Sequence, residues 1–255
     1  MIHDLERVRL AAEWARVGGG FTVPPAEYPV DLERLVGRTA VQAPRDYRAL
    51  AVAISWIAQN HELVNVRRLG KVAAMLDPLP SAIMGAMIGA VQEADAGADR
   101  LIVAQRHCHR LREPRALFDR TEANPVLRSF ARDGALPVFA DWGLWQDELS
   151  LKFDALRPIS WILENCPELR LRGLYGPGLE AEVLQVLDRG EATIAAIARE
   201  VDASYSATHA AVSRLSGRGS IVSLEGQGVA LCEPVREWIH GFESVSRQHR
   251  TKLAL

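Results

Sequence analysis

The sequence has little of several features that would mark a class of protein. It contains only three cysteines among 255 residues, and aromatic residues make up 6%. An odd number of widely spaced cysteines excludes a disulfide-dense secreted scaffold and favours a reducing compartment. The formal net charge of -2 provides no overall attraction to nucleic acid or to an anionic membrane. Any contact with nucleic acid must therefore rest on a local patch of charge.

Long hydrophobic runs are also missing. The longest weakly charged stretch covers residues 79–92, which is too short to cross a bilayer and is interrupted by Pro80. The first residues carry charges and lack the apolar segment of a signal peptide. With 48% hydrophobic residues, the chain can nevertheless bury a sizeable core. We expect a globular cytoplasmic protein that makes no contact with a membrane.

Motifs of catalysis and of cofactor binding are missing as well. The sequence has no nucleophile elbow, no convincing pair of catalytic carboxylates and no dinucleotide-binding glycine pattern. The segment His107-Cys108-His109 has metal-ligating residue types, but adjacent residues point in different directions. We therefore expect no enzyme activity, no cofactor and no metal site. Cys108 is interpreted as a small apolar residue or as a redox sensor whose thiol pKa the neighbouring arginines lower.

The apolar residues of positions 1–175 recur at helical spacing, which predicts a mostly helical domain. We expect this domain to sense a signal, to mediate dimerisation or to bind a partner. Pro78 and Pro80 are expected to end one helix, and Ser81 to cap the next. Asn124 followed by Pro125 predicts the beginning of another helix. The ranges in which helices are expected are 4–17, 50–59, 64–76, 82–96, 125–134 and 159–163.

Three further patterns organise this part of the chain. Gly85 and Gly89 lie four residues apart on one expected helix, which indicates close helix packing in a protein core. The proline-rich residues 21–44 are expected to be extended. Glycines and a proline over residues 173–178 predict a linker, so we place the domain boundary there.

The most basic tract of the chain lies within this first domain. Residues 100–120 contain six arginines and two acidic residues. Arg106, Arg110, Arg112 and Arg115 are candidates for a phosphate-contacting patch. The alternative is a solvated face whose charges pair with acids elsewhere.

The C-terminal part has a spacing that points to a class of function. Residues 179–187, 193–201 and 204–215 each carry one apolar face at helical spacing, and only a short break separates the last two. Thr193 and Ser204 are the expected caps. Residues 221–232 contain two short apolar runs around a glycine-containing turn, which predicts a β-hairpin.

This order resembles the winged-helix DNA-binding superfamily, especially prokaryotic regulators of the multiple-antibiotic-resistance and arsenical-resistance types. The residues that carry the resemblance are 190–201, 204–215 and 219–222. The resemblance covers the C-terminal part of the chain only and implies a winged helix-turn-helix with a short β-hairpin wing over 176–235. Together with the helical periodicity of residues 1–175, it predicts a mainly α fold. Val235, Trp238, Ile239 and Phe242 lie at helical spacing, so residues 236–255 are expected to form a C-terminal dimerisation helix.

The resemblance also implies which residues bind DNA. In such folds the third helix presents its exposed N-terminal residues to the major groove. These positions and the nearest arginines are Ser204, Tyr205, Ser206, His209, Ser213, Arg214 and Arg218. The implied protein is a transcriptional regulator that binds double-stranded DNA as a homodimer. Its first domain would respond to a small-molecule effector or to a protein partner.

The charge of this region keeps a second function open. Residues 189–222 contain four arginines and three acidic residues, whereas phosphate neutralisation dominates the affinity for DNA. A winged helix with so little positive charge fits a protein-binding adaptor or an antitoxin-like partner. The same surface would then contact protein instead of DNA.

Overall fold

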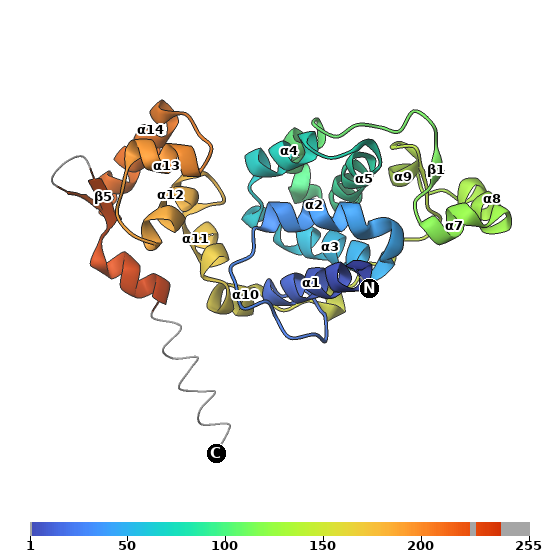
Figure 1. Cartoon of the computed structure of the whole chain (residues 1–255), viewed down its shortest axis with the longest axis horizontal. Coiled ribbons are helices and arrows are strands. Elements are labelled where there is room, and N and C mark those ends of the chain that lie inside the picture. The colour runs from blue at the N-terminus through green and yellow to red at the C-terminus, as the bar shows by residue number, and fades with distance from the viewer. Residues whose placement is uncertain (1, 225–227, 241–255) are drawn as a thin grey trace, which may run out of the picture. The chain divides into compact units, whose positions relative to one another are not determined.

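The structure is a computed structural model that describes residues 2–224 and 228–240 (Figure 1). The chain divides into two compact units, Met1–Ile159 and Ser160–Leu255. Helices dominate both units, and the strands form one two-stranded and one three-stranded sheet. The predicted fold class, mainly α with a short β-hairpin, is confirmed. Within the described residues, no helix is long and apolar enough to cross a membrane.

The first unit is built around two almost completely buried helices, α3 and α5, which pack against each other (Figure 1). A short parallel pair, β1 (Arg115–Ala116) and β2 (Leu144–Trp145), joins two loops of the unit. Its helices are α1 (Ile2–Arg16), α2 (Leu32–Gln42), α3 (Tyr47–Asn60), α4 (Val66–Ala74), α5 (Pro78–Ala94), α6 (Ile102–Gln105), α7 (Asp119–Ala123), α8 (Pro125–Asp133) and α9 (Pro137–Ala140). Short 3-10 helices lie at η1 (Ala43–Arg45), η2 (His61–Leu63), η3 (Ala96–Leu101) and η4 (Phe153–Ala155).

Helix α2 corrects the prediction that residues 21–44 are extended. The Asp31 carboxylate accepts a hydrogen bond from the backbone N–H of Arg34 at 3.1 Å and caps the helix. Leu32, Leu35 and Val36 then form one buried face. The prediction was wrong because the prolines at 24, 25 and 29 all precede Asp31, so none of them lies within the helix that follows.

The beginning of α5 corrects a second prediction. Pro78 and Pro80 do not end a helix, and Ser81 is not its cap; both prolines lie in the first turn of α5, after the cap residue Asp77. Proline is tolerated there because the first backbone N–H groups of a helix have no partner within the helix. The hydroxyl of Ser81 instead accepts a hydrogen bond from the backbone N–H of His109 at 2.8 Å.

The two glycines of α5 allow close packing, as the sequence predicts. A Cβ atom at Gly85 would lie 2.4 Å from Cζ3 of Trp142, so the indole ring rests directly on the helix backbone. A Cβ atom at Gly89 would lie 2.9 Å from Cγ2 of Val138. Both contacts bring α9 and the loop that follows it onto α5.

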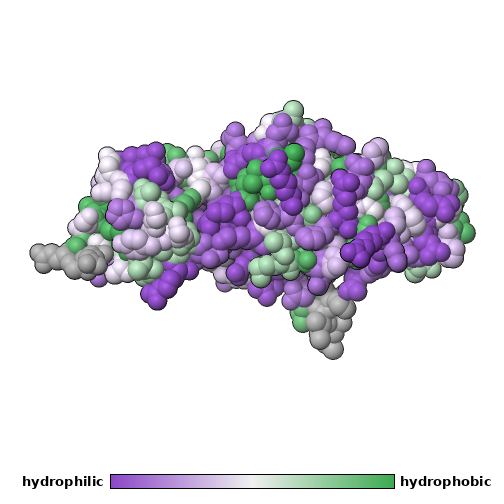
Figure 2. Space-filling model, turned by 90° about the horizontal axis from the view of Figure 1, so that it is seen from above, coloured by the Kyte–Doolittle hydropathy of each residue, from purple (hydrophilic) through white to green (hydrophobic). Residues whose placement is uncertain are grey.

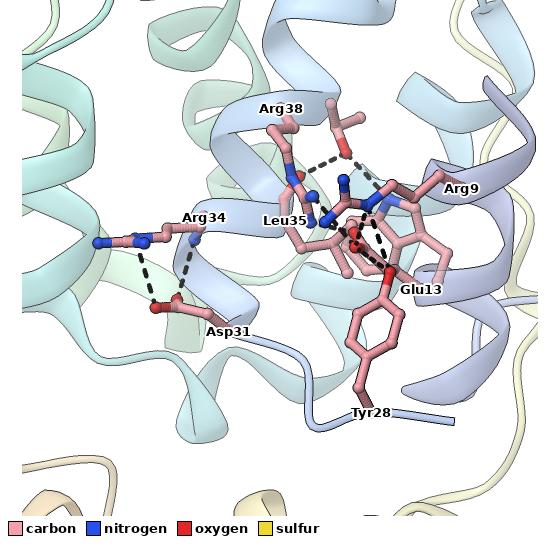
Figure 3. Close-up of polar contacts among 9 residues, drawn as sticks. Arg9, Glu13, Tyr28, Asp31, Arg34, Leu35 and Arg38 are labelled. Carbon is pink, nitrogen blue, oxygen red and sulfur yellow. Dashed lines mark hydrogen bonds and ion pairs between the residues drawn. The ribbon is translucent and has the colours of Figure 1, made fainter. Parts of the chain in front are cut away.

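A polar network around Glu13 joins α1 to α2 and to the segment between them (Figure 3). The Glu13 side chain is only 1% exposed. Its carboxylate accepts hydrogen bonds from Tyr28 Oη at 2.8 Å, from Arg38 Nη1 at 3.0 Å and from Arg9 Nε at 3.3 Å. The buried negative charge is therefore neutralised by two arginines from different helices. The hydrogen bond with Tyr28 is the largest cause that raises the pKa of Arg9, and the hydrogen bond with Glu13 raises it further.

The second unit contains helices α10 to α14, a further helix over residues 233–240, and a three-stranded sheet (Figure 1). Its core includes Val183 and Leu187 from α12, Ile197 from α13, and Leu215 from α14. The elements are α10 (Ile159–Asn165), α11 (Pro167–Tyr175), α12 (Leu179–Asp188), β3 (Ala192–Thr193), α13 (Ile194–Glu200), α14 (Tyr205–Gly217), β4 (Ile221–Ser223) and β5 (Gly228–Leu231).

The division between the units differs from the predicted boundary after residue 175. Helix α11 packs against α12, and Leu171 belongs to the core of the second unit. Residues 160–175 are therefore part of the second unit. The glycine-rich turn at 176–178 is a turn inside this unit, where Gly176 takes a positive φ of 77°.

The apolar face of the last described helix is used within the chain. Ile239 is buried in the core of the second unit, and Val235 and Trp238 pack against it. These residues belong to the face that predicted a dimerisation helix. The rest of the predicted C-terminal helix, including Phe242, lies outside the described residues.

Candidate nucleic-acid interface

The helix that was predicted to read DNA is α14, and local caps define its ends. The hydroxyl of Ser204 accepts a hydrogen bond from the backbone N–H of Ala207 at 3.2 Å, and Thr193 caps α13 in the same way through Ala196 at 3.2 Å. Both predicted caps are confirmed. Between the helices, Asp202 adopts a positive φ of 49°, which Asp tolerates better than most residues. The chain thus turns sharply between α13 and α14.

Helix α14 has one buried face and one exposed face. Ala211, Val212 and Leu215 are buried in the core of the second unit. On the outside, Tyr205 is 58% exposed and its ring lies 6.1 Å from the ring of His209, centroid to centroid. The remaining predicted side chains of the exposed face are Ser204, Ser206 and Ser213. This face is polar and rich in hydrogen-bonding groups, and the only exposed lysine or arginine side chain within α14 is Arg214, near its C-terminal end.

The two strands that follow α14, β4 and β5, form a three-stranded antiparallel sheet together with β3, which precedes α13; the strand order is β3-β5-β4. Ile221 pairs with Leu231 in the hairpin, and Ala192 pairs with Val229 on the other side of β5. The hairpin was predicted, whereas β3 was not. A strand of two residues directly before a helix leaves no periodicity in the sequence. Residues 225–227 of the predicted hairpin turn lie outside the described residues.

Arg214 and Arg218 share one carboxylate partner. Arg214 Nε donates to Glu180 Oε1 at 2.6 Å, and Arg218 Nη1 donates to Glu180 Oε2 at 2.6 Å. Glu180 lies at the beginning of α12 and its side chain is 13% exposed. The two arginines therefore tie the end of α14 to the beginning of α12. The sequence predicted them as phosphate contacts and did not identify Glu180.

The charge of the second unit remains unfavourable for an anionic partner. From residue 160 onward, the chain carries ten lysines and arginines against twelve acidic residues. Arg189 pairs with Glu200 at 2.5 Å. Among the described residues, exposed Arg199 makes no ion pair. The surface around α14 thus presents hydrogen-bonding groups with little positive charge.

The basic tract of the first unit does not form one helical face. Helix α6 ends at Gln105, and the four candidate arginines follow on mostly irregular chain. Arg115 pairs with Asp119 at 3.3 Å, and the guanidinium of Arg110 lies 5.5 Å from the ring centroid of Trp142. Arg106 and Arg112 are exposed and have no ion pair in the part of the chain that the structure describes. The four arginines therefore do not form one helical face, and one of them, Arg115, forms an ion pair with an acidic residue.

Of the two interpretations of Cys108, the pKa contradicts the redox sensor and leaves the small apolar residue. Burial raises the pKa of its thiol to about 12, although arginines were expected to lower it. The desolvation of the thiolate is the dominant effect, because burial penalises the charged form. No group of three or more His, Cys, Asp or Glu side chains in the described ranges lies in position to hold a metal ion.

Comparisons with protein-family models, with curated proteins and with solved structures give no match for the chain. The arguments about function therefore rest on the geometry and chemistry of the two units.

Proposed function

We propose that the second unit is a winged helix that binds double-stranded DNA and that the protein is a cytoplasmic transcriptional regulator. The observation that carries this proposal is the order α12, β3, α13, α14, β4 and β5, with β5 central in the sheet. This arrangement supports α14 from one side and leaves its polar face exposed. A helix held in this way fits the major groove of B-DNA.

The exposed groups of α14 have distinct roles in this proposal. Ser204 caps the N-terminus of α14. The other backbone N–H groups of the first turn can bind a DNA phosphate. Tyr205, Ser206 and His209 donate or accept hydrogen bonds at base edges or phosphates. Ser213 extends the same face by another turn. Arg214 and Arg218 orient α14 through Glu180 and contribute less charge than free arginines would.

The modest charge of each unit implies that DNA binding depends on two copies of the chain. Because few phosphates are neutralised by one copy, its affinity is low. A two-fold homodimer doubles the contacts and places two α14 helices in successive major grooves, about 34–36 Å apart. The expected operator is therefore a palindrome with half-sites roughly one helical turn apart.

An anisotropy titration of the full chain on DNA from directly upstream of its own gene tests this function. Replacing both Tyr205 and His209 with alanine should weaken specific binding at least about tenfold, because contacts with base edges contribute roughly 1–3 kcal/mol each. Ser160→Ala, at an exposed site of α10 and outside α14, is the control and should bind like the parent. Equal affinity for the upstream DNA and for a scrambled duplex would contradict the proposal.

A second candidate function, a protein-binding adaptor or antitoxin-like partner, is favoured by one specific observation. Glu180 pairs with Arg214 in the last turn of α14 and with its C-cap residue Arg218, and the unit as a whole carries an excess of acid. A surface of this kind suits a protein partner better than a phosphate backbone. A stable partner at fixed stoichiometry in size-exclusion chromatography, together with no DNA binding at low salt, would favour this alternative.

A further inference from the structure

A groove on the first unit has a hydrophobic floor and a basic border. It lies along α4 and α6 and has a volume of about 690 Å³. Figure 2 looks at the molecule from above the view of Figure 1 and shows a hydrophobic area bordered by hydrophilic surface near the middle of the horizontal axis, close to the position of α4 along that axis in Figure 1. The lining residues are Val66, Arg67, Gly70, Lys71, Ala74, Arg100, Val103 and His107.

Two of the residues that line the groove, Gly70 and Ala74, are small. A Cβ atom at Gly70 would lie 2.9 Å from Cδ2 of His107 and 3.7 Å from Cα of Ala104, so α4 and α6 pack closely at this point. Val66 and Val103 supply apolar side chains, and Val103 remains 51% exposed. An exposed valine beside a hollow lined by small residues leaves apolar surface that a ligand can cover.

The charges around the groove all have the same sign. Three of the eight lining residues, Arg67, Lys71 and Arg100, carry a positive charge, and none of the eight is acidic. Arg100 is held by backbone carbonyls, because its Nη2 donates to Val64 O at 3.0 Å and its Nη1 to Glu62 O at 3.5 Å. These hydrogen bonds fix the guanidinium without cancelling its charge. Within the described residues Arg100 makes no ion pair, so its positive charge is available to a ligand.

We propose that this groove binds a small anionic molecule that carries an apolar body and a phosphate or carboxylate group. Its volume lies within the roughly 300–1,000 Å³ that is typical of small-molecule sites. The apolar body would cover Val66 and Val103, and the anionic group would pair with Arg100 and its basic neighbours. A nucleic-acid strand fits less well, because no Phe, Tyr or Trp lines the groove to stack a base. This site belongs to the first unit alone and does not depend on DNA binding by the second.

Calorimetric titration of the full chain with 1-naphthyl phosphate tests the site, because this probe combines both chemical features. It should bind at least about tenfold more tightly than 1-naphthol or inorganic phosphate alone, since each comparator lacks one half of the interaction. Its affinity should fall with added salt. A parallel titration with 1-naphthoate, which carries a carboxylate in place of the phosphate, shows which of the two anionic groups the site binds more tightly. If naphthyl phosphate binds no more tightly than naphthol, the basic border has no role and the proposal fails.

Two matched variants place the binding in the groove. Val103→Asp introduces a negative charge beside the groove and should weaken naphthyl phosphate binding at least about tenfold. Val126→Asp makes the same change at a 63% exposed valine of α8, outside the groove, and should leave binding unchanged. Both sites are exposed, so both variants should fold, which thermal unfolding checks. An equal loss in the two variants would overturn the proposal, while the DNA titration remains an independent measurement.

Discussion

Glu180 accepts hydrogen bonds from two arginines at the C-terminal end of the proposed DNA-reading helix, Arg214 in its last turn and the C-cap residue Arg218. Arg214 and Arg218 are 54% and 57% exposed, so water already screens both ion pairs. Their contribution to folding is therefore small, about 0–1 kcal/mol each. Their effect on the charge near α14 is larger, because a single carboxylate occupies both guanidinium groups. If the second unit binds DNA as proposed, Glu180 should therefore lower its affinity for DNA more than it stabilises the fold.

The variant Glu180→Gln separates these two effects. We expect it to bind DNA several-fold more tightly and to show a steeper dependence on salt, because two arginines become available to phosphates. Its free energy of unfolding should change by no more than about 1–2 kcal/mol. Anisotropy titrations at two salt concentrations and urea unfolding measure both quantities.

Glu191→Gln is the matched control for this prediction. It removes the same charge from an exposed position of the second unit, but Glu191 pairs with no arginine in the described part of the chain. Its gain in affinity should be clearly smaller than that of Glu180→Gln. Similar gains for both variants would mean that overall charge matters and that the release of Arg214 and Arg218 does not.

Cys108 offers a second test at a single residue. Because the thiolate is the reactive form, a rise of the pKa from 9.0 to about 12 lowers the reactive fraction at pH 8 about a thousandfold. We expect iodoacetamide to alkylate Cys108 in the folded chain at least about a hundredfold more slowly than in urea, and the rate to rise with pH up to about 12. Peptide mapping by mass spectrometry follows this residue alone. Equal rates in the folded and unfolded chain would contradict the buried thiol.

At the scale of an element, Gly85 determines how closely the Trp142 ring approaches α5. In Gly85→Ala the new methyl group would meet the ring at 2.4 Å, and Trp142 is buried, so it has little room to move. The gain in helix propensity, roughly 1 kcal/mol, is opposed by an overpacking cost of about 1–3 kcal/mol. We expect the free energy of unfolding to fall by about 1–2 kcal/mol in urea titrations.

Gly217→Ala is the matched substitution within a helix that has open space. Nothing lies within 4 Å of a Cβ atom at this position of α14. The helix-propensity gain is then unopposed, and the variant should be stabilised by about 0.5 kcal/mol. The opposite signs of the two glycine substitutions are the expected result. Stabilisation by Gly85→Ala would show that Trp142 is loosely packed.

The elements that could be predicted from the sequence are those whose boundaries depend on neighbouring residues. Asn124 caps α8 and Ser204 caps α14 through side-chain contacts two or three residues away, so local rules find them. Helix α2 was missed because the density of prolines before Asp31 obscured its apolar spacing. Strand β3 exists only through its pairing with β5, which lies far along the chain.

The same distinction explains what could be predicted of the candidate site. The exposed face of α14 follows from helical spacing, and the structure places Tyr205, Ser206, His209 and Ser213 on the outside. The pairing of Arg214 and Arg218 with Glu180 spans 34 and 38 residues, and no local rule predicts it. Their separation by four residues did contain a signal, because such residues share one face of a helix and can share a partner.

At the scale of the whole molecule, each unit has a core made from its own residues. The core of the second unit combines Leu171 from α11 with residues of α12, α13, α14 and the sheet, and includes Ile239. Arg170 adds a polar link, because its guanidinium, only slightly exposed, donates to the carbonyl oxygens of Leu163, Glu164 and Ile239. Helices α10 and α11 thus hold the last described helix in place.

This arrangement predicts where the second unit can be cut from the chain. A fragment covering residues 160–255 should unfold cooperatively in urea, with Trp161 and Trp238 reporting the transition. A fragment covering residues 176–255 begins at the boundary predicted from the sequence, and it lacks α11 and the Arg170 hydrogen bonds to Ile239. It should lose at least about 3 kcal/mol, because Leu169 and Leu171 each contribute roughly 1.5–3 kcal/mol through burial. Equal stability of the two fragments would place the boundary after residue 175, since α10 and α11 would then contribute nothing to the fold of the unit.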